Sequence, residues 1–231
     1  MNAPLSIARD ETRITPAIED YLKAIYQLSR EEPQLGGVTG HRLARRLGVA
    51  APSVTNMVKR LRELDLVEHE RYREIDLTKE GEQIALEVVR HHRLLERYLV
   101  EALGYGWDEV HDEAERLEHH ISEALEARMA AVLGDPTLDP HGDPIPRLDG
   151  SVSTVLEQRL LDLTPGQTAV VGRVSDQDPE RLRYLQQLGI TPGTRVTLLE
   201  TLPFDGPLRL EIAGVEQVIG RSLAATVQVA A

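Results

Sequence analysis

The stretch TGHRLARRLGVAAPSVTNMVKRLRELD, residues 39–65, predicts two short helices joined by a tight turn. Thr39 can cap the first helix, HRLARRL, because its hydroxyl can accept a hydrogen bond from a free amide of the first turn. Gly48 can end that helix in a left-handed conformation. Pro52 suits the first turn of the second helix, PSVTNMVKRLRELD, where its missing N–H costs nothing. Two short helices across a glycine-containing turn indicate a helix-turn-helix.

The segments on either side of this stretch extend the predicted unit. Thr15-Pro16 and the run AIEDYLKAIYQLS after it predict a preceding amphipathic helix. Residues 66–78, LVEHERYREIDLT, alternate loosely around a charged turn, which is typical of a two-stranded hairpin. Such a hairpin would be the wing of a winged helix-turn-helix domain, which we expect to span residues 1–80.

The charge of this unit differs from that of the whole chain. The net charge is −12, yet residues 41–62 contain six basic residues and no acidic residue. In a helix-turn-helix the start of the second helix enters the major groove, and we expect four of its side chains to reach base edges. These are Pro52, Ser53, Thr55 and Asn56. Phosphate contacts are expected from basic residues of both helices and of the wing. These are Arg45, Lys59, Arg60, Arg71 and Arg73.

An ordinary three-helix bundle with solvated basic residues is the alternative interpretation. The wing and the acid-free run over residues 41–62 favour DNA binding instead.

The composition excludes several other classes of function. The chain has 231 residues, 41% of them hydrophobic, which is enough to bury a core. It contains no cysteine, and this excludes disulfides and thiol catalysis. No run approaches the roughly 20 apolar residues of a membrane span, and the start of the sequence lacks the apolar core of a signal peptide. We therefore expect a cytoplasmic protein that does not contact a membrane.

The middle of the chain predicts two long helices, over residues 79–103 and 108–133. The stretch HDEAERLEHH, residues 111–120, would place four side chains along one face of the second helix, because residues three and four apart are neighbours. These are His111, Glu115, Glu118 and His119. His92 and Glu96 lie four apart on the first helix. Two such faces together can surround a divalent cation, whereas clustered carboxylates without a cation repel one another. A solvated acidic face with incidental histidines is the alternative; His91 and His120, which lie off these faces, are expected to be exposed.

The last third of the chain has a different pattern. Residues 134–150, GDPTLDPHGDPIPRLDG, are dense in proline, glycine and aspartate and predict an irregular connection. Beyond residue 151, short β-branched runs alternate with turn signals, and DPERLRYLQQLG inserts one helix. The predicted fold class is mainly α with a small barrel-like β domain. The predicted domains are 1–80, 81–150 and 151–231.

Four motifs accompany the predicted winged helix-turn-helix and are typical of one family. They are DLTKEG after the wing, HHRLLERYL and VHDEAERLEHH in the two long helices, and HGDPIP in the connection. The chain resembles the diphtheria-toxin-repressor family of iron- and manganese-dependent transcriptional regulators. Its last third looks like the SH3-like domain that longer members share with ferrous-iron-transport accessory proteins. The resemblance implies a transcriptional repressor of metal-uptake genes that binds double-stranded operator DNA as a homodimer. It implies no enzymatic activity and no small organic substrate.

The resemblance also implies two metal sites per subunit. One would use Asp20, Glu115, Glu118 and His119, and the other His92, Glu96, His111 and Asp178. Asp176 and Glu180 are alternatives to Asp178 in the C-terminal domain. The segment after His120, ISEALEARMAAVL, would contribute to the dimer interface through an apolar stripe; packing of that stripe within one subunit is the alternative. The stripe consists of Ile121, Leu125, Met129 and Val132.

Three departures from the family pattern are informative. Asp20 and Glu115 stand where iron regulators carry methionine and cysteine, and hard oxygen ligands favour Mn(II), although Fe(II) accepts the same set. Lys23 stands where manganese-selective relatives with a paired metal site carry a second carboxylate. Ala50 and Ala51 offer no capping side chain before Pro52, which costs roughly 1 kcal/mol in helix stability.

Two other functions compete with this interpretation. A metal-dependent enzyme with a DNA-binding appendage would need an open coordination position and a substrate pocket. A metal buffer or transport accessory would have to bind metal through the β domain, which has few ligand residues. The chain shows no nucleophile or general-base motif, and this favours the regulator.

Overall fold

The structure is a computed structural model that describes residues 14–31, 37–69, 74–153, 158–175 and 178–230. The chain divides into two compact units. The first comprises residues 1–91, 118–120 and 146–151, and the second comprises 92–117, 121–145 and 152–231. The boundaries at residues 80 and 150 stay predictions. Across the described ranges, every helix is too short or too polar to span a bilayer.

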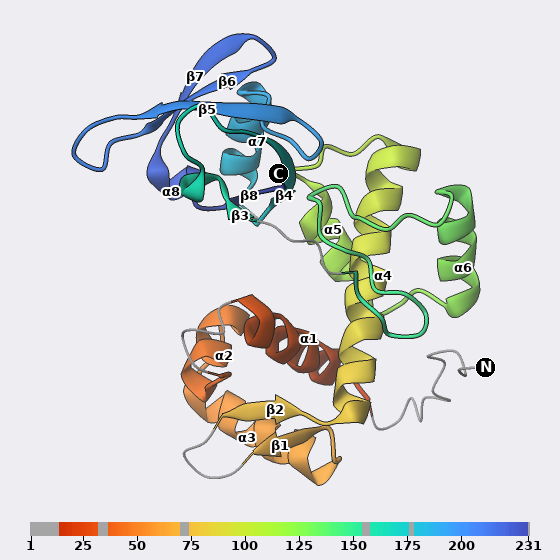
Figure 1. The fold of residues 1–231 in the computed structure, drawn as a ribbon. Helices are drawn as coiled ribbons and strands as arrows, with labels where there is room; N and C mark the ends of the chain where they lie inside the picture. The colour runs from red at the N-terminus through yellow and green to blue at the C-terminus, as the bar shows by residue number, and fades with distance from the viewer. Residues whose placement is uncertain (1–13, 32–36, 70–73, 154–157, 176–177, 231) are drawn as a thin grey trace. The chain divides into compact units, whose positions relative to one another are not determined.

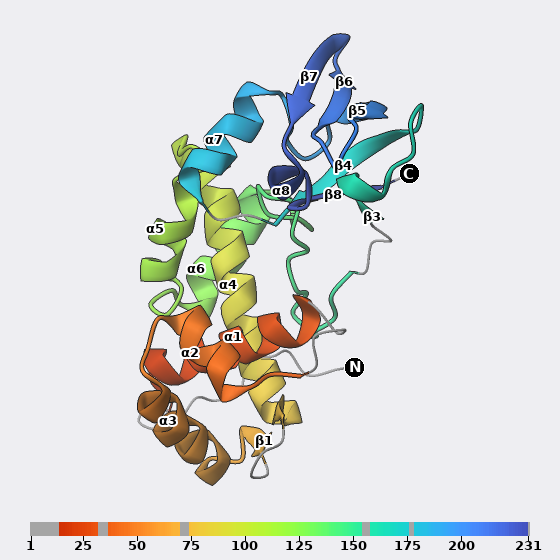
Figure 2. The same cartoon turned by 90° about the vertical axis from the view of Figure 1, so that its left-hand side faces the viewer.

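The first unit contains the helix-turn-helix. Its elements are α1 (Pro16–Glu31), α2 (Gly40–Leu47), α3 (Ala51–Glu63), β1 (Val67–His69), β2 (Ile75–Leu77) and the start of α4 (Lys79–Leu103). Figure 1 shows the three helices gathered with the hairpin, and Figure 2 shows α3 beside β1. Apolar side chains from successive helices fill its core, including the fully buried Leu22, Ile25, Leu43 and Leu61. Burial of one such side chain stabilises a fold by about 1.5–3 kcal/mol.

The helix ends in this unit confirm the predicted caps. The Thr39 hydroxyl accepts a hydrogen bond from the Arg42 amide, and Gly48 has a φ of 65°, in the left-handed region. Ala50 occupies the N-cap of α3 and makes no side-chain capping hydrogen bond. The short strands β1 and β2 pair antiparallel, with Glu68 opposite Asp76. The wing therefore follows α3 directly.

The prediction of one helix over residues 108–133 is wrong. Two helices occupy this stretch, α5 (Val110–Leu117) and α6 (Glu123–Val132), with a turn over residues 118–120. Ser122 starts the second helix, because its side chain accepts a hydrogen bond from the Leu125 amide. His91 is 2% exposed, contrary to the prediction of an exposed side chain. Its Nδ1 lies 3.2 Å from the carbonyl oxygen of Glu118. Because α5 ends at Leu117, this carbonyl lies beyond the last helical residue, and the imidazole can donate a hydrogen bond to it.

The second unit contains the β domain. Its six-stranded sheet has the order β3-β8-β4-β5-β6-β7, with antiparallel neighbours. The strands are β3 (Gln158–Arg159), β4 (Thr168–Val174), β5 (Arg195–Thr201), β6 (Leu208–Ile212), β7 (Val215–Ile219) and β8 (Val227–Ala230). The 3₁₀ turn η2 (Leu160–Asp162) and the helices α7 (Pro179–Gln187) and α8 (Arg221–Ala224) complete it. The β-branched runs AVVGRV, RVTLLE, LRLEI and ATVQV correspond to β4, β5, β6 and β8. No run predicted β3, which has two residues, or β7, which lacks a continuous apolar run.

A tryptophan outside the β domain completes its core. Trp107 lies between α4 and α5, is 7% exposed, and belongs to the same buried cluster as Leu160, Leu185 and Val196. Next to it, the Asp108 carboxylate accepts a hydrogen bond of 2.9 Å from Arg183 of α7. The loop between α4 and α5 is therefore packed into the β domain within the second unit.

The connection after α6 also meets the β domain. A Cβ at Gly142 would lie 2.0 Å from the carbonyl oxygen of Gly172 in β4, and the φ of Gly142 is +92°. Only glycine suits both the close approach and the left-handed conformation. The turn that carries His141 is thus held against β4.

Candidate metal centres and DNA-binding surface

The side chains predicted to read DNA lie at the surface of the first unit. Exposed side chains on α3 include all six of the predicted contacts, and Arg45 of α2 is exposed as well. The six are Pro52, Ser53, Thr55, Asn56, Lys59 and Arg60. The Thr55 hydroxyl donates a hydrogen bond to the carbonyl of Ala51, so its proton is engaged within the helix. Arg71 and Arg73 lie outside the described residues.

Three ligand atoms from two helices meet in the second unit. His92 and Glu96 project from α4, and His111 projects from α5. The distances are 3.0 Å between His92 Nε2 and Glu96 Oε1, 3.1 Å between His92 Nε2 and His111 Nδ1, and 3.2 Å between His111 Nδ1 and Glu96 Oε1. We call these three residues the His92 centre. The resemblance implied that all three belong to one site.

This triangle has the dimensions of one face of a metal octahedron. Two ligand atoms at about 2.1–2.2 Å from a metal, at a right angle, lie about 3.0–3.1 Å apart. Each of the three distances matches that separation to within about 0.2 Å. The donor set of two imidazoles and one carboxylate suits Mn²⁺, Fe²⁺ or Zn²⁺. The residues present therefore fit a divalent cation.

The charge at Glu96 is maintained despite its burial. Burial raises the pKa of this carboxyl, but the charge of His92 and hydrogen bonds with His111, His141 and His92 outweigh it and lower the pKa well below the usual range. Glu96 is 2% exposed. A buried carboxylate that stays ionised is the form that binds a cation.

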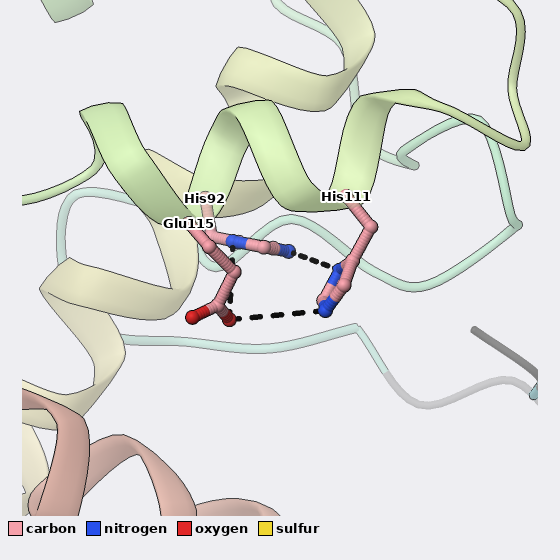
Figure 3. Close-up of side chains that lie close together, drawn as sticks. All are labelled: His92, His111 and Glu115. Carbon is pink, nitrogen blue, oxygen red and sulfur yellow. Dashed lines mark hydrogen bonds and ion pairs between the residues drawn. The ribbon is translucent and has the colours of Figure 1, made fainter. Parts of the chain in front are cut away.

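Glu115 lies beside the His92 centre. Its Oε1 is 3.9 Å from His92 Nδ1 and 3.8 Å from His111 Nε2, and Figure 3 shows the carboxylate facing the two rings. The resemblance implied that Glu115 shares a site with Asp20. The structure instead groups it with the two imidazoles, because Glu115 and His111 lie on successive turns of α5. Its role as a ligand stays a prediction.

A second group of ligand atoms forms in the first unit. Asp20 projects from α1, and Glu118 and His119 lie in the turn after α5. The Nε2 atom of His119 is 2.8 Å from Asp20 Oδ1 and 3.5 Å from Glu118 Oε1. We call these three residues the Asp20 centre. Their oxygen and nitrogen atoms lie close enough together to hold one cation.

Glu19 orients the imidazole of this centre. Its Oε2 lies 2.6 Å from His119 Nδ1, so the ring donates Nδ1–H to Glu19 and directs Nε2 toward Asp20. Burial lowers the pKa of His119, but the hydrogen bonds to Asp20 and Glu19 outweigh it and raise the pKa to about 10. A metal on Nε2 would replace a proton there, while the bond to Glu19 would fix the ligating tautomer. Glu19 was not predicted as a site residue, although it adjoins Asp20 on the amphipathic α1.

Lys23 also meets the Asp20 centre. Its Nζ donates to both oxygens of Glu118, at 2.9 and 2.8 Å, and the two side chains are 6% and 0% exposed. A cation that binds Glu118 must therefore share the carboxylate with an ammonium. Lys23 therefore adds a positive charge at the position where manganese-selective relatives with a paired metal site would add a carboxylate.

A third group in the second unit consists of Glu96, Asp139 and His141, all buried. Burial raises the pKa of Asp139 to about 7, helped by the charge of Glu96. Burial lowers the pKa of His141, but the hydrogen bond and charge of Glu96 raise it to about 9. The guanidinium of Arg93 approaches the group, with Nε 3.7 Å from Asp139 Oδ2. Asp139 and His141 were not predicted as site residues, because they lie in an irregular stretch without helical spacing.

Asp178 caps a helix of the β domain. Its Oδ1 accepts a hydrogen bond of 2.9 Å from the Glu180 amide and caps α7. None of the three ligand groups found in the described ranges includes Asp178 or Glu180. Asp176 lies outside those ranges. The role of Asp178 as a ligand stays a prediction.

The basic and exposed helix α3, together with the partly buried groups of imidazole and carboxylate ligands, defines a metal-responsive DNA-binding protein. Models of three protein domains match the chain. They are the iron-dependent repressor N-terminal DNA-binding domain over residues 13–75, the iron-dependent repressor metal-binding and dimerisation domain over 78–147, and the FeoA domain over 158–231.

Curated relatives and solved structures agree with these domains. The iron-dependent repressor IdeR of Mycobacterium leprae is 39% identical over 87% of this chain and 90% of its own. The diphtheria toxin repressor of Corynebacterium diphtheriae is 32% identical over 91% of this chain and 95% of its own. A structure of a manganese-dependent transcriptional repressor in complex with manganese is 42% identical, with a TM-score of 0.86, and covers 92% of this chain and 99% of that one.

The chain belongs to the iron-dependent repressor family. It is a metal-dependent, DNA-binding transcriptional repressor with an N-terminal DNA-binding domain, a helical metal-binding and dimerisation domain and a C-terminal FeoA-type β domain. This confirms the predicted family, fold class and regulatory function. The alternative of a metal-dependent enzyme is not supported, because the relatives that match most of the length of this chain are repressors.

Proposed function

We propose that this repressor responds to Mn²⁺ and binds one cation at each of two centres per subunit, the Asp20 centre and the His92 centre. The observation that carries the proposal is the triangle of His92 Nε2, His111 Nδ1 and Glu96 Oε1, whose sides of 3.0, 3.1 and 3.2 Å suit octahedral coordination. The ligand atoms of both centres are nitrogen and oxygen, and the chain contains no cysteine. The carboxylate oxygens are hard ligands that suit manganese, the imidazoles also accept later metals, and neither centre contains the sulfur ligands that soft metals prefer.

Fe²⁺ is the second candidate, because it accepts the same ligands. The related proteins include both iron-dependent repressors and manganese-dependent ones.

Asp20 gives metal binding a direct effect on the DNA-binding domain. It projects from α1, the first helix of that domain, whereas Glu118 and His119 lie in the turn that leads into α6. A cation held by all three would join α1 to that turn. By differential affinity, the metal would favour the arrangement of α1 that is competent to bind DNA. A change from 1% to 99% competent would need about 5.5 kcal/mol of such preference.

We further propose that α6 contributes to a homodimer that binds double-stranded operator DNA in the cytoplasm. Leu125 is 46% exposed and Val132 is 71% exposed, and they lie seven residues apart on α6. Met129 is buried within the subunit, so the predicted stripe is divided between the core and the surface. A symmetric dimer would place two α3 helices at half-sites about 34–36 Å apart or a multiple of it.

The test is DNA binding, measured by fluorescence anisotropy on candidate operators at fixed salt. Chelator, Mn²⁺, anaerobic Fe²⁺ and Zn²⁺ are compared. Tight binding with Mn²⁺ that chelator abolishes is the expected result. Binding that is tightest with Fe²⁺ would replace manganese with iron, and binding unaffected by chelator would refute metal control.

A further inference from the structure

His141 lies between the His92 centre and the β domain. Its Nδ1 is 3.7 Å from Glu96 Oε2, at ion-pair distance, while the other oxygen of Glu96 faces His92 and His111. The two oxygens of one carboxylate thus have separate tasks. Oε1 belongs to the His92 centre, and Oε2 faces His141.

The opposite side of the imidazole is held by backbone. His141 Nε2 lies 2.7 Å from the carbonyl oxygen of Trp107, which can only accept, so the ring donates Nε2–H there. The Trp107 and His141 rings also stack, with centroids 5.5 Å apart and planes at 28°. The Trp107 side chain in turn belongs to the core of the β domain. His141 therefore has one proton-bearing nitrogen committed to Trp107 and the other directed at Glu96.

The backbone around His141 keeps the ring in this place. Asp139 Oδ1 accepts hydrogen bonds from the amides of His141, at 2.8 Å, and Asp143, at 2.9 Å, which closes a tight turn. Arg93 of α4 donates to the carbonyl of Pro144 at 2.6 Å and ties the same turn to the helix that carries Glu96. The imidazole is 6% exposed and has little freedom to choose another partner.

We propose that His141 is a positioning residue: it holds the second oxygen of Glu96 and thereby connects the His92 centre to Trp107 and the core of the β domain. This inference rests on the proposed role of Glu96 as a metal ligand. Metal ligands depend on outer partners of this kind for their orientation, and loss of such a partner typically weakens metal binding about 10–100-fold. The connection needs no metal ligand from the β domain itself.

A third cation among Glu96, Asp139 and His141 is the competing interpretation of the same residues. Asp139 Oδ1 is already committed to two amides, and the guanidinium of Arg93 faces Oδ2 at 3.7 Å. An added cation would be repelled by Arg93 and would find few uncommitted lone pairs on Asp139. The geometry therefore favours a positioning role over a further metal site.

Two substitutions separate the two sides of the imidazole. In His141→Asn the amide nitrogen takes approximately the place of Nδ1 and can donate to Glu96, whereas in His141→Gln it takes approximately the place of Nε2 and can donate to the Trp107 carbonyl. Both are introduced into the full chain carrying His119→Ala, so that the Asp20 centre does not contribute. Mn²⁺ affinity and stoichiometry are measured by isothermal titration calorimetry, with thermal unfolding measured alongside. Glu96→Gln in the same background tests the centre itself.

The expected result is at least tenfold weaker Mn²⁺ binding in His141→Gln, and binding within about threefold of the background in His141→Asn. Equal Mn²⁺ affinities in the two His141 variants, or tighter binding in His141→Gln, would overturn the inference about His141. The proposed function would remain intact in that case if Glu96→Gln lost Mn²⁺ binding. No loss in Glu96→Gln would overturn both. If the His119→Ala background bound one additional Mn²⁺ per subunit and both His141 variants lost it, the residues would form a third cation site and the positioning role would be overturned.

Discussion

Replacement of Lys23 by methionine should destabilise the metal-free protein and make it more dependent on metal. The Lys23 ammonium donates to both oxygens of Glu118, and the exposed fractions of the two side chains are 6% and 0%. Removal of one partner from a buried ion pair leaves a buried charge and costs about 3–5 kcal/mol. We expect a loss of that size in the free energy of unfolding, measured by urea denaturation in chelator.

The same substitution should increase the stabilisation that metal provides. A cation on Glu118 would no longer share the carboxylate with an ammonium, so it would compensate the buried charge. We expect Mn²⁺ to bind the Asp20 centre at least tenfold more tightly in Lys23→Met, which corresponds to about 1.4 kcal/mol. At saturating metal, the difference in unfolding free energy between the variant and the wild type should shrink by about that amount.

Arg30→Met is the matched control, because it removes a cation from the same helix but from an exposed pair. Arg30 Nη2 lies 3.2 Å from Glu82 Oε1, and the side chains are 59% and 45% exposed. Such pairs contribute about 0–1 kcal/mol, and the effect of metal should be unchanged. If Lys23→Met costs no more than Arg30→Met, or if Mn²⁺ stabilises it no more than wild type, the reasoning about Glu118 is refuted.

Three further changes test the other surfaces. Asp20→Ala should abolish metal-dependent operator binding in fluorescence anisotropy while circular dichroism stays unchanged, because α1 loses its ligand; an unchanged metal response would disprove the coupling. Asn56→Ala should weaken specific binding by about 1–3 kcal/mol, with a much smaller effect on non-specific DNA, and equal losses on both would exclude a base contact. Leu125→Glu should shift the protein toward monomer in sedimentation velocity, because it places a charge on the exposed face of α6; a dimer of unchanged stability would move the interface elsewhere.

The sequence predicted most of the architecture because the decisive signals are local. Thr39 and Gly48 determine the ends of α2 through their own capping groups, and the structure has both caps. The His92 triangle was also within reach, because His92 and Glu96 lie four residues apart on one helix and place their ligand atoms on one face. Such features depend on spacing along one element.

The features that escaped prediction depend on contacts between elements. Glu19 acquires its importance only because the turn after α5 brings His119 within 2.6 Å of it. His141 lies in a stretch without regular spacing, and its two partners, Glu96 and Trp107, are 45 and 34 residues away. The break after Leu117 was missed because Leu117, Ile121 and Leu125 keep a helical spacing across it, while the Ser122 cap starts a new helix.

That break determines how the ligands of HDEAERLEHH are used. On one continuous helix, Glu118 and His119 would lie a single turn beyond Glu115 and would extend the same row of side chains. In the structure α5 ends first, so His111 and Glu115 lie with His92, whereas Glu118 and His119 lie with Asp20. Ten residues therefore contribute to two separate ligand groups, one in each compact unit. Two cations would act on the two ends of this one segment, and only the cation at the Asp20 centre would bind a ligand on α1.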